Sequence, residues 1–190
     1  WYSQAGTPVL KAVGQYDAAA QTYTLTLSQS CAPTVGQSEK LPFVIPVQMG
    51  LLTAAGQAIA LQLQGDEAAQ GASRMLVLTE AEQSFVFANV PEAPVPSLLR
   101  SFSAPVVLDC EFSDADLLTL LAHDSDPFNQ WEASQRLGMR YALKSIAAPA
   151  DTASASGQSG TEILPADFVQ AMRRVLQDNK LDAAFKDLVL

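Results

Sequence analysis

The first 112 residues alternate apolar and polar side chains with a period of two, which is typical of strands with one buried face. The clearest run is 22–31, where Tyr23, Leu25, Leu27 and Cys31 alternate with threonines and serines. Similar runs predict six more strands, at 8–13, 43–51, 59–63, 75–78, 83–87 and 106–112. About seven short strands separated by glycine, proline and serine turns predict a β-sandwich of immunoglobulin-like type.

Prolines change the prediction for two segments of this β-sandwich. Pro42 and Pro46 lie beside or within the 43–51 run. Because proline has no N–H to donate to a sheet, this strand is expected at an edge or a bulge. The three prolines of 91–96 are interpreted as a stiff connection between strands.

After residue 112 the hydrophobic period becomes that of helices. Ser113, followed three residues later by Asp116, resembles a capping box and predicts a helix over 114–122. Asp126 as N-cap, with proline at the next position, predicts a second helix over 127–146. Two further helices are predicted, over 165–178 and 183–190.

The helix predicted over 127–146 carries a polar stripe at every fourth residue, namely Glu132, Arg136, Arg140 and Lys144. Most of its other positions are apolar or small, and Phe128 and Trp131 are interpreted as core aromatics. A helix that is apolar around most of its circumference is expected to be surrounded by other helices.

These patterns divide the chain into a β-sandwich domain over 1–112 and the first helices of a C-terminal helical domain over 113–190. The alanine-, serine- and glycine-rich segment 147–161 is expected to be a mobile loop. The last helix ends without a glycine cap, so the helical domain is expected to be truncated. Trp1 is not an initiator methionine and no basic segment follows it, which predicts a piece of a longer protein without a signal peptide.

Composition and charge limit the classes of partner that this chain is expected to bind. The chain has 190 residues, 48% of them hydrophobic, and a net charge of −9 that both predicted domains share. Repulsion from phosphate backbones and anionic headgroups makes nucleic acids and membrane surfaces poor partners. Cys31 and Cys110 both fall on the apolar phase of their strands. Two buried free thiols in a reducing compartment are therefore favoured over an inter-strand bridge in a secreted sandwich.

His123 is the single histidine, so this chain alone cannot supply an H-E-x-x-H zinc site. It follows the predicted 114–122 helix, where a structural imidazole near the helix dipole is favoured over a catalytic triad. Asp124, Ser125 and Asp126 resemble the start of a calcium loop, but the fifth and twelfth positions lack oxygen ligands of the required kind. Asp126 is better explained as an N-cap and Asp124 as a solvated side chain.

The carboxylates Glu80, Glu82, Asp109 and Glu111 include one close pair, the last two, of the kind that a glycosidase uses. Solvated surface is favoured, because no cleft or partner is evident nearby. A small independent enzyme built on this pair or on His123 is the least favoured interpretation. No catalytic, cofactor-binding or metal-ligating residue is assigned.

Four stretches resemble the bacterial aminopeptidase N family, and they occur in the order found there: WYSQAGTP, LTEAEQSFVF, VPSLLRSFSAPV and HDSDPFNQWEA. The similarity covers about 1–146 well and 165–190 more loosely. It implies the small β-sandwich domain and the start of the C-terminal helical domain of a cytoplasmic, zinc-dependent alanyl aminopeptidase, which removes N-terminal residues from peptides.

The family's zinc-binding and catalytic motifs lie in a separate catalytic domain, and none has a matching position here. The resemblance therefore implies a non-catalytic spacer or scaffold, inactive alone and without a cofactor of its own. Its partners would be the catalytic domain and the remaining helices of the same parent chain, and its exposed apolar helices favour self-association. The alternative is a secreted immunoglobulin-like adhesion or carbohydrate-binding module.

Overall fold

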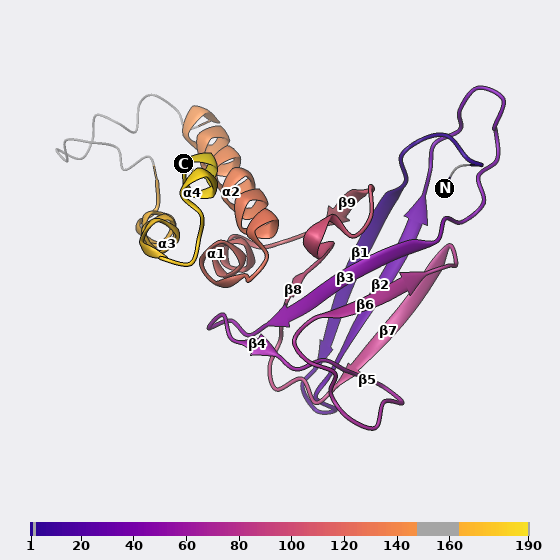
Figure 1. The fold of residues 1–190 in the computed structure, drawn as a ribbon, viewed down its shortest axis with the longest axis horizontal. Coiled ribbons are helices and arrows are strands. Elements are labelled where there is room, and N and C mark those ends of the chain that lie inside the picture. The colour runs from indigo at the N-terminus through magenta and orange to yellow at the C-terminus, as the bar shows by residue number, and fades with distance from the viewer. Residues whose placement is uncertain (2, 148–163, 190) are drawn as a thin grey trace. The chain divides into compact units, whose positions relative to one another are not determined.

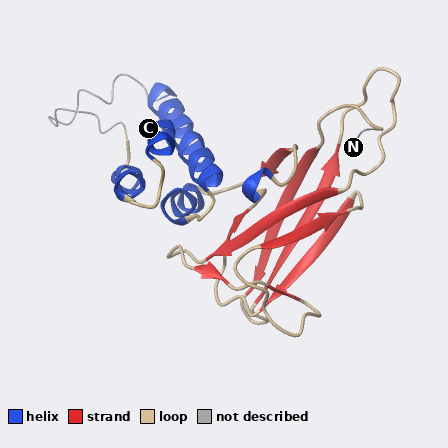
Figure 2. Cartoon of the chain, in the orientation of Figure 1, coloured by secondary structure: helices blue, strands red, loops and turns tan. Residues whose placement is uncertain are grey.

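The computed structural model describes residues 1, 3–147 and 164–189, which fall into two compact units, Trp1–Phe112 and Ser113–Leu190 (Figure 1). The loop predicted at 147–161 lies, apart from its first residue, outside the described residues. The first unit contains strands and one short 3₁₀ turn, and the second contains helices (Figure 2).

The first unit is a sandwich of two sheets. One sheet has five strands in the order β5-β7-β2-β1-β9, and the other holds β4-β3-β6, with β8 also paired to β3. The strands are β1 (Val9–Asp17), β2 (Thr22–Ser30), β3 (Ile45–Leu52), β4 (Ala58–Ile59), β5 (Gln62–Leu63), β6 (Arg74–Leu78), β7 (Glu82–Ala88), β8 (Val95–Ser97) and β9 (Val107–Cys110). The predicted immunoglobulin-like sandwich is confirmed, with two more described strands than the seven expected.

Alternation along the strands builds the core between the sheets. Leu25 and Leu27 of β2 are at most 1% exposed, and the inward residues of β3 are all at 0%. Those residues are Ile45, Val47, Met49 and Leu51. They join one hydrophobic cluster that draws on both sheets. Burying each such side chain is worth about 1.5–3 kcal/mol, so this layer dominates the stability of the unit.

The strand with Pro46 is not an edge strand over its whole length, because β3 pairs with β4, β6 and β8. Around Pro46, however, β6 is its one partner among the described strands. Gln48, whose N–H points to the same side as the Pro46 nitrogen, donates to Ser103 Oγ at 2.9 Å and not to a strand. Proline is tolerated at this point because no ladder hydrogen bond is lost there.

The connection predicted at 91–96 contains a strand that the sequence did not reveal. β8 pairs antiparallel with β3, with Ser97 opposite Gly50 and Pro96 opposite Leu51. Val95 and Ser97 are 5% and 0% exposed, so burial of the flanking residues holds the proline within the strand.

A short turn, η1 (Arg100–Phe102), leads from β8 towards β9 and is anchored by a buried cation. Arg100 is 7% exposed, and its Nε donates to Ser97 Oγ at 2.7 Å. Its guanidinium lies directly against Gly50, where an added Cβ would stand 2.3 Å from the Arg100 Cζ. Gly50 is therefore required by the close approach of this side chain.

The described residues of the second unit form four helices: α1 (Asp114–His123), α2 (Pro127–Ala147), α3 (Ala166–Gln177) and α4 (Ala183–Val189). Ser113 Oγ accepts the Asp116 N–H at 3.1 Å, and the Asp116 carboxylate accepts the Ser113 N–H at 2.9 Å. The predicted capping box is confirmed. The Asn129 N–H donates to Asp126 Oδ1 at 3.1 Å, which confirms the N-cap of α2.

Replacing Gly50 by alanine is expected to destabilise the sandwich by about 1–3 kcal/mol, because the new methyl group displaces the Arg100 guanidinium. Gly138→Ala is the matched control. Gly138 lies within α2 with open space where its Cβ would be, so alanine should stabilise the helical unit by up to about 1 kcal/mol. Denaturant unfolding of both variants measures the two changes. Equal effects at the two positions would contradict the packing described for Arg100.

Candidate functional site

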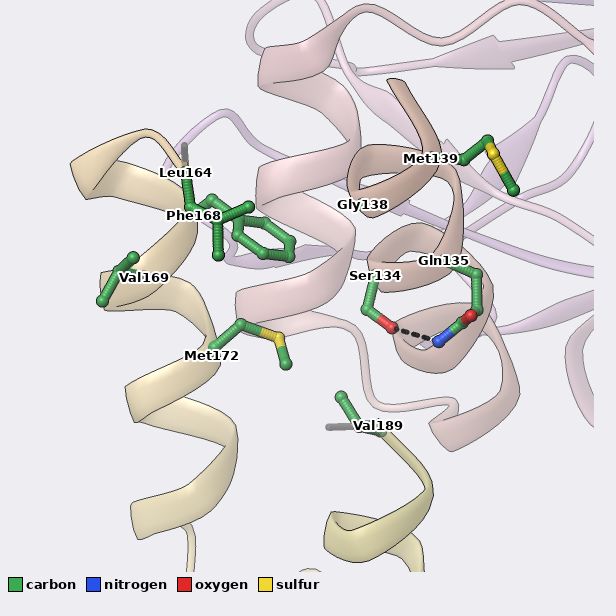
Figure 3. A pocket seen from close by; sticks show the side chains of 9 residues that line it. All are labelled: Ser134, Gln135, Gly138, Met139, Leu164, Phe168, Val169, Met172 and Val189. Carbon is green, nitrogen blue, oxygen red and sulfur yellow. Dashed lines mark hydrogen bonds between the residues drawn. The ribbon is translucent and has the colours of Figure 1, made fainter. Parts of the chain in front are cut away.

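An apolar groove runs between three helices of the second unit (Figure 3). Its volume is about 480 Å³. The lining residues are Ser134, Gln135, Gly138 and Met139 of α2, Leu164, Phe168, Val169 and Met172 on the α3 side, and Val189 of α4. Most of these side chains are apolar, so the groove suits a hydrophobic partner and offers little for polar recognition.

One side of the groove is formed by a buried aromatic side chain of α3, and the groove is open above the backbone of α2. Phe168 is 6% exposed and packs edge-on against Tyr141 of α2, with ring centroids 5.5 Å apart. Figure 3 shows Phe168 and Met172 projecting from α3 towards α2. An added Cβ on Gly138 would meet nothing within 4 Å, so the groove is open directly above the α2 backbone.

Exposed apolar side chains continue the groove along α2. Met139, Leu143 and Ile146 are 63%, 57% and 81% exposed, and their spacing puts them on one helix face. Within the described residues, the prediction that α2 is surrounded by other helices therefore fails for this face. Large exposed apolar groups gathered in one place indicate a surface that is buried against a partner.

A different face of α2 is fixed against α1 by charges. Arg140 and Lys144 of the predicted polar stripe contact Asp114 at 2.8 and 3.0 Å, and Arg136 pairs with Glu132 within the helix at 2.6 Å. The hydrogen bond from Arg140, followed by that from Lys144, holds the pKa of Asp114 below its ordinary value. These groups are half-exposed, so each pair is worth at most about 1 kcal/mol and serves mainly to orient α1 on α2.

His123 is the last residue of α1, the location that the sequence predicted. Its Nε2 lies 3.1 Å from a terminal guanidinium nitrogen of Arg174. Since arginine can only donate, the histidine nitrogen accepts, and the contact joins α1 to α3. Burial, and secondarily the positive charge of Arg174, lower the pKa of His123.

Asp124 is not solvated, and that interpretation of the sequence is wrong. The residue is 4% exposed, and its Oδ1 accepts the Asp126 N–H at 3.0 Å. The Asp124 carboxylate thus stabilises the turn that joins α1 to α2. Because it accepts a backbone hydrogen bond within this turn, the side chain is buried. The apparent calcium-loop pattern is accounted for by this turn and by the N-cap at Asp126.

The core interpretation of Phe128 and Trp131 holds only in part. Both are half-buried, and their rings contact one another with centroids 5.5 Å apart. Glu80, Glu82, Asp109 and Glu111 are all exposed, and Asp109 lies opposite Lys11 in the β1–β9 pair.

The two cysteines are free and half-buried, so they are less enclosed than predicted. Cys31 directly follows β2 and Cys110 ends β9, with β1 lying between these two strands. Two strand spacings separate them by about 9–10 Å, which is beyond the reach of a disulfide. An inter-strand bridge between them is excluded by this topology.

Within the described residues, no group of three or more His, Cys, Asp and Glu side chains is placed to hold a metal ion. In the same part of the chain no helix is both long and apolar enough to cross a bilayer. The groove was not predicted, because it forms only where three helices separated in sequence meet.

Comparisons with known proteins match both units. Residues 6–111 match the family described as "Domain of unknown function (DUF3458) Ig-like fold", and residues 114–190 match "Domain of unknown function (DUF3458_C) ARM repeats". Aminopeptidase N of Escherichia coli (strain K12) is 38% identical over 191 residues, covering 100% of this chain and 21% of that protein. Aminopeptidase N of Caulobacter vibrioides is 37% identical over 190 residues, covering 100% and 20%.

A solved structure gives the same result. The crystal structure of Legionella pneumophila aminopeptidase A in complex with aspartic acid matches with a TM-score of 0.71 and 27% identity. The match covers 98% of this chain and 18% of that chain. The present chain thus spans about a fifth of the length of these relatives.

The burial of His123, together with the nearby charge of Arg174, makes the helical unit sensitive to pH. Because the folded pKa of His123 lies below the ordinary value of 6.5, the unfolded chain binds more protons in this window. Stability should be complete above that value and fall as pH drops through the folded pKa. His123→Gln, which keeps a hydrogen-bonding side chain, should flatten the dependence between about pH 5 and pH 7. Thermal unfolding across this range measures it, and an unchanged slope in the variant would contradict the assignment.

Proposed function

The chain belongs to the DUF3458 family and is homologous to a segment of bacterial aminopeptidase N; on this basis we propose that it is a non-catalytic scaffold in a zinc-dependent aminopeptidase. The parent enzyme removes N-terminal residues from peptides. The observation that carries this proposal is the 38% identity to Escherichia coli aminopeptidase N, which extends over the whole of this chain.

The scaffold role fits the side chains that are present. Zinc sites in such hydrolases use three protein ligands and leave one position open. The single histidine does not fit this requirement, because its Nε2 faces the Arg174 guanidinium, and the described residues offer no other cluster. The proposal therefore assigns the parent's zinc to residues outside this chain.

The groove is the docking surface for further helices of the parent chain. ARM-type repeats stack so that each repeat covers the apolar face of its neighbour. The helical unit matches an ARM-repeat family, and its apolar groove continues along an exposed face of α2. The relatives are about five times longer than this chain, so a parent protein of similar length would contain the additional helices that such stacking requires.

The parent enzyme works in the cytoplasm. This part of the proposal is supported by the two free cysteines, which the strand order holds too far apart to pair. A reducing compartment suits such thiols.

Leu143→Gln tests the groove. In the isolated chain it should weaken self-association without loss of stability, because Leu143 is 57% exposed there. In the full-length protein it should lower stability by about 1–3 kcal/mol, because a polar group is then buried without a partner. Val35→Gln is the control, since Val35 lies fully exposed in the sandwich unit. Size-exclusion chromatography measures the self-association, and thermal unfolding measures the stability. An unchanged stability of Leu143→Gln in the full-length protein would refute the proposal that this groove is a docking surface.

The isolated chain should hydrolyse no aminoacyl amide, even with added zinc, whereas the full-length protein should do so and lose activity to a chelator. A chromogenic aminoacyl substrate measures both. Chelator-sensitive activity in the isolated chain that disappears in His123→Ala would overturn the non-catalytic role.

A further inference from the structure

A glycine inside α2 is not explained by the described part of the unit that contains it. Gly138 lies within a 21-residue helix, where only proline is less favourable than glycine. Its φ is not in the left-handed region, so the backbone does not require glycine. An added Cβ would meet no described atom within 4 Å, in contrast to Gly50, where Arg100 fills the space. Neither conformation nor packing among the described residues therefore accounts for this glycine.

The position of Gly138 in the groove gives the glycine a use. Gln135, Gly138 and Met139 lie at i, i+3 and i+4 on α2, and all three line the groove (Figure 3). Residues at this spacing border the hole into which a facing helix inserts a side chain. Phe168 and Met172 line the groove from α3, so the hole is bordered by apolar groups. Its shape and its lining suit a large apolar side chain.

We propose that Gly138 forms the hole that receives a large apolar side chain from a further helix of the parent polypeptide, outside residues 1–190. The inference rests on the proposed function, which supplies that helix. It names the residue of the docking surface that sets how closely the helix approaches. Packed helices lie about 8–10 Å apart, depending on the side chains at the contact, and glycine permits the shorter distances. A longer side chain at position 138 would displace the docked helix.

Three observations select this occupant. Residues 114–190 match a family described as ARM repeats, in which the helices of one repeat pack against those of the next. The described residues of the sandwich unit form strands and one short 3₁₀ turn, so that unit has no described helix to face α2. The relatives are about five times longer than this chain, which leaves ample polypeptide to supply the helix.

Gly138→Leu, which fills the hole, tests the proposal by thermal unfolding. The matched control is Gln170→Leu, which adds the same side chain at an exposed position of α3 that does not line the groove. In the isolated chain, at a concentration at which it is monomeric, Gly138→Leu should raise the Tm because leucine favours helix more than glycine does. In the full-length protein Gly138→Leu should lower the Tm by several degrees, whereas Gln170→Leu should leave it unchanged. Gly138→Ala should raise the Tm of the isolated chain only.

Hydroxyl-radical footprinting reports on the docked helix directly. Met139 is 63% exposed in the described structure, so it should react readily in the dilute isolated chain. In the full-length protein it should react several-fold more slowly, because the docked helix covers it. Gly138→Leu should restore the fast reaction there, and Gln170→Leu should not.

A raised Tm and a protected Met139 in full-length Gly138→Leu would overturn this inference. If Leu143→Gln still destabilised the full-length protein, the proposed docking surface would remain. Fast reaction of both Met139 and Leu143 in the unsubstituted full-length protein would overturn both proposals. A lower Tm of the isolated Gly138→Leu chain would refute the inference by identifying an occupant within residues 1–190. Protection of Met139 in the full-length protein that disappears on dilution would refute it by identifying a second copy.

Discussion

Enclosure of strand β3 is the constraint on which the sandwich unit depends. Its inward side chains are the most completely buried layer of the core, and its backbone pairs with three other strands. On its outer side, Gly50 leaves room for Arg100, and the Gln48 N–H binds Ser103. The same strand therefore sets the core, the sheet and the turn that carries Phe102.

The helical unit buries its apolar surface less completely than the sandwich unit does. Asp114, Arg140 and Lys144 orient α1 on α2, and the edge-on contact between Tyr141 and Phe168 joins α2 to α3. These contacts fix the helices but leave one face of α2 uncovered in the described part of the chain. Such a unit resembles one repeat of a stacked array, in which stability is shared with the neighbouring repeat and cannot be assigned to one repeat alone.

Local patterns were enough to predict most of the fold. The alternation at 22–31 and the pair of Ser113 and Asp116 each act over a few residues, and both appear as β2 and as the cap of α1. Features that depend on distant residues escaped prediction. β8 pairs because β3 lies beside it, Asp124 is buried because its turn folds inwards, and the groove needs three helices at once. The burial of the Arg100 guanidinium likewise depends on Gly50, a residue far away in the sequence.

The parallel pairing of β1 with β9 sets an order of events during synthesis. Val9 is aligned with Val107, so the first strand acquires its second neighbour only after roughly a hundred further residues have been made. Until then one edge of β1 carries unpaired N–H and C=O groups, the feature that invites pairing with another chain. A nascent polypeptide that pauses before β9 thus exposes a sheet edge that the finished unit covers. Covering that edge early, by a chaperone or by the rest of the parent chain, would therefore protect the unfinished sandwich from pairing with other chains.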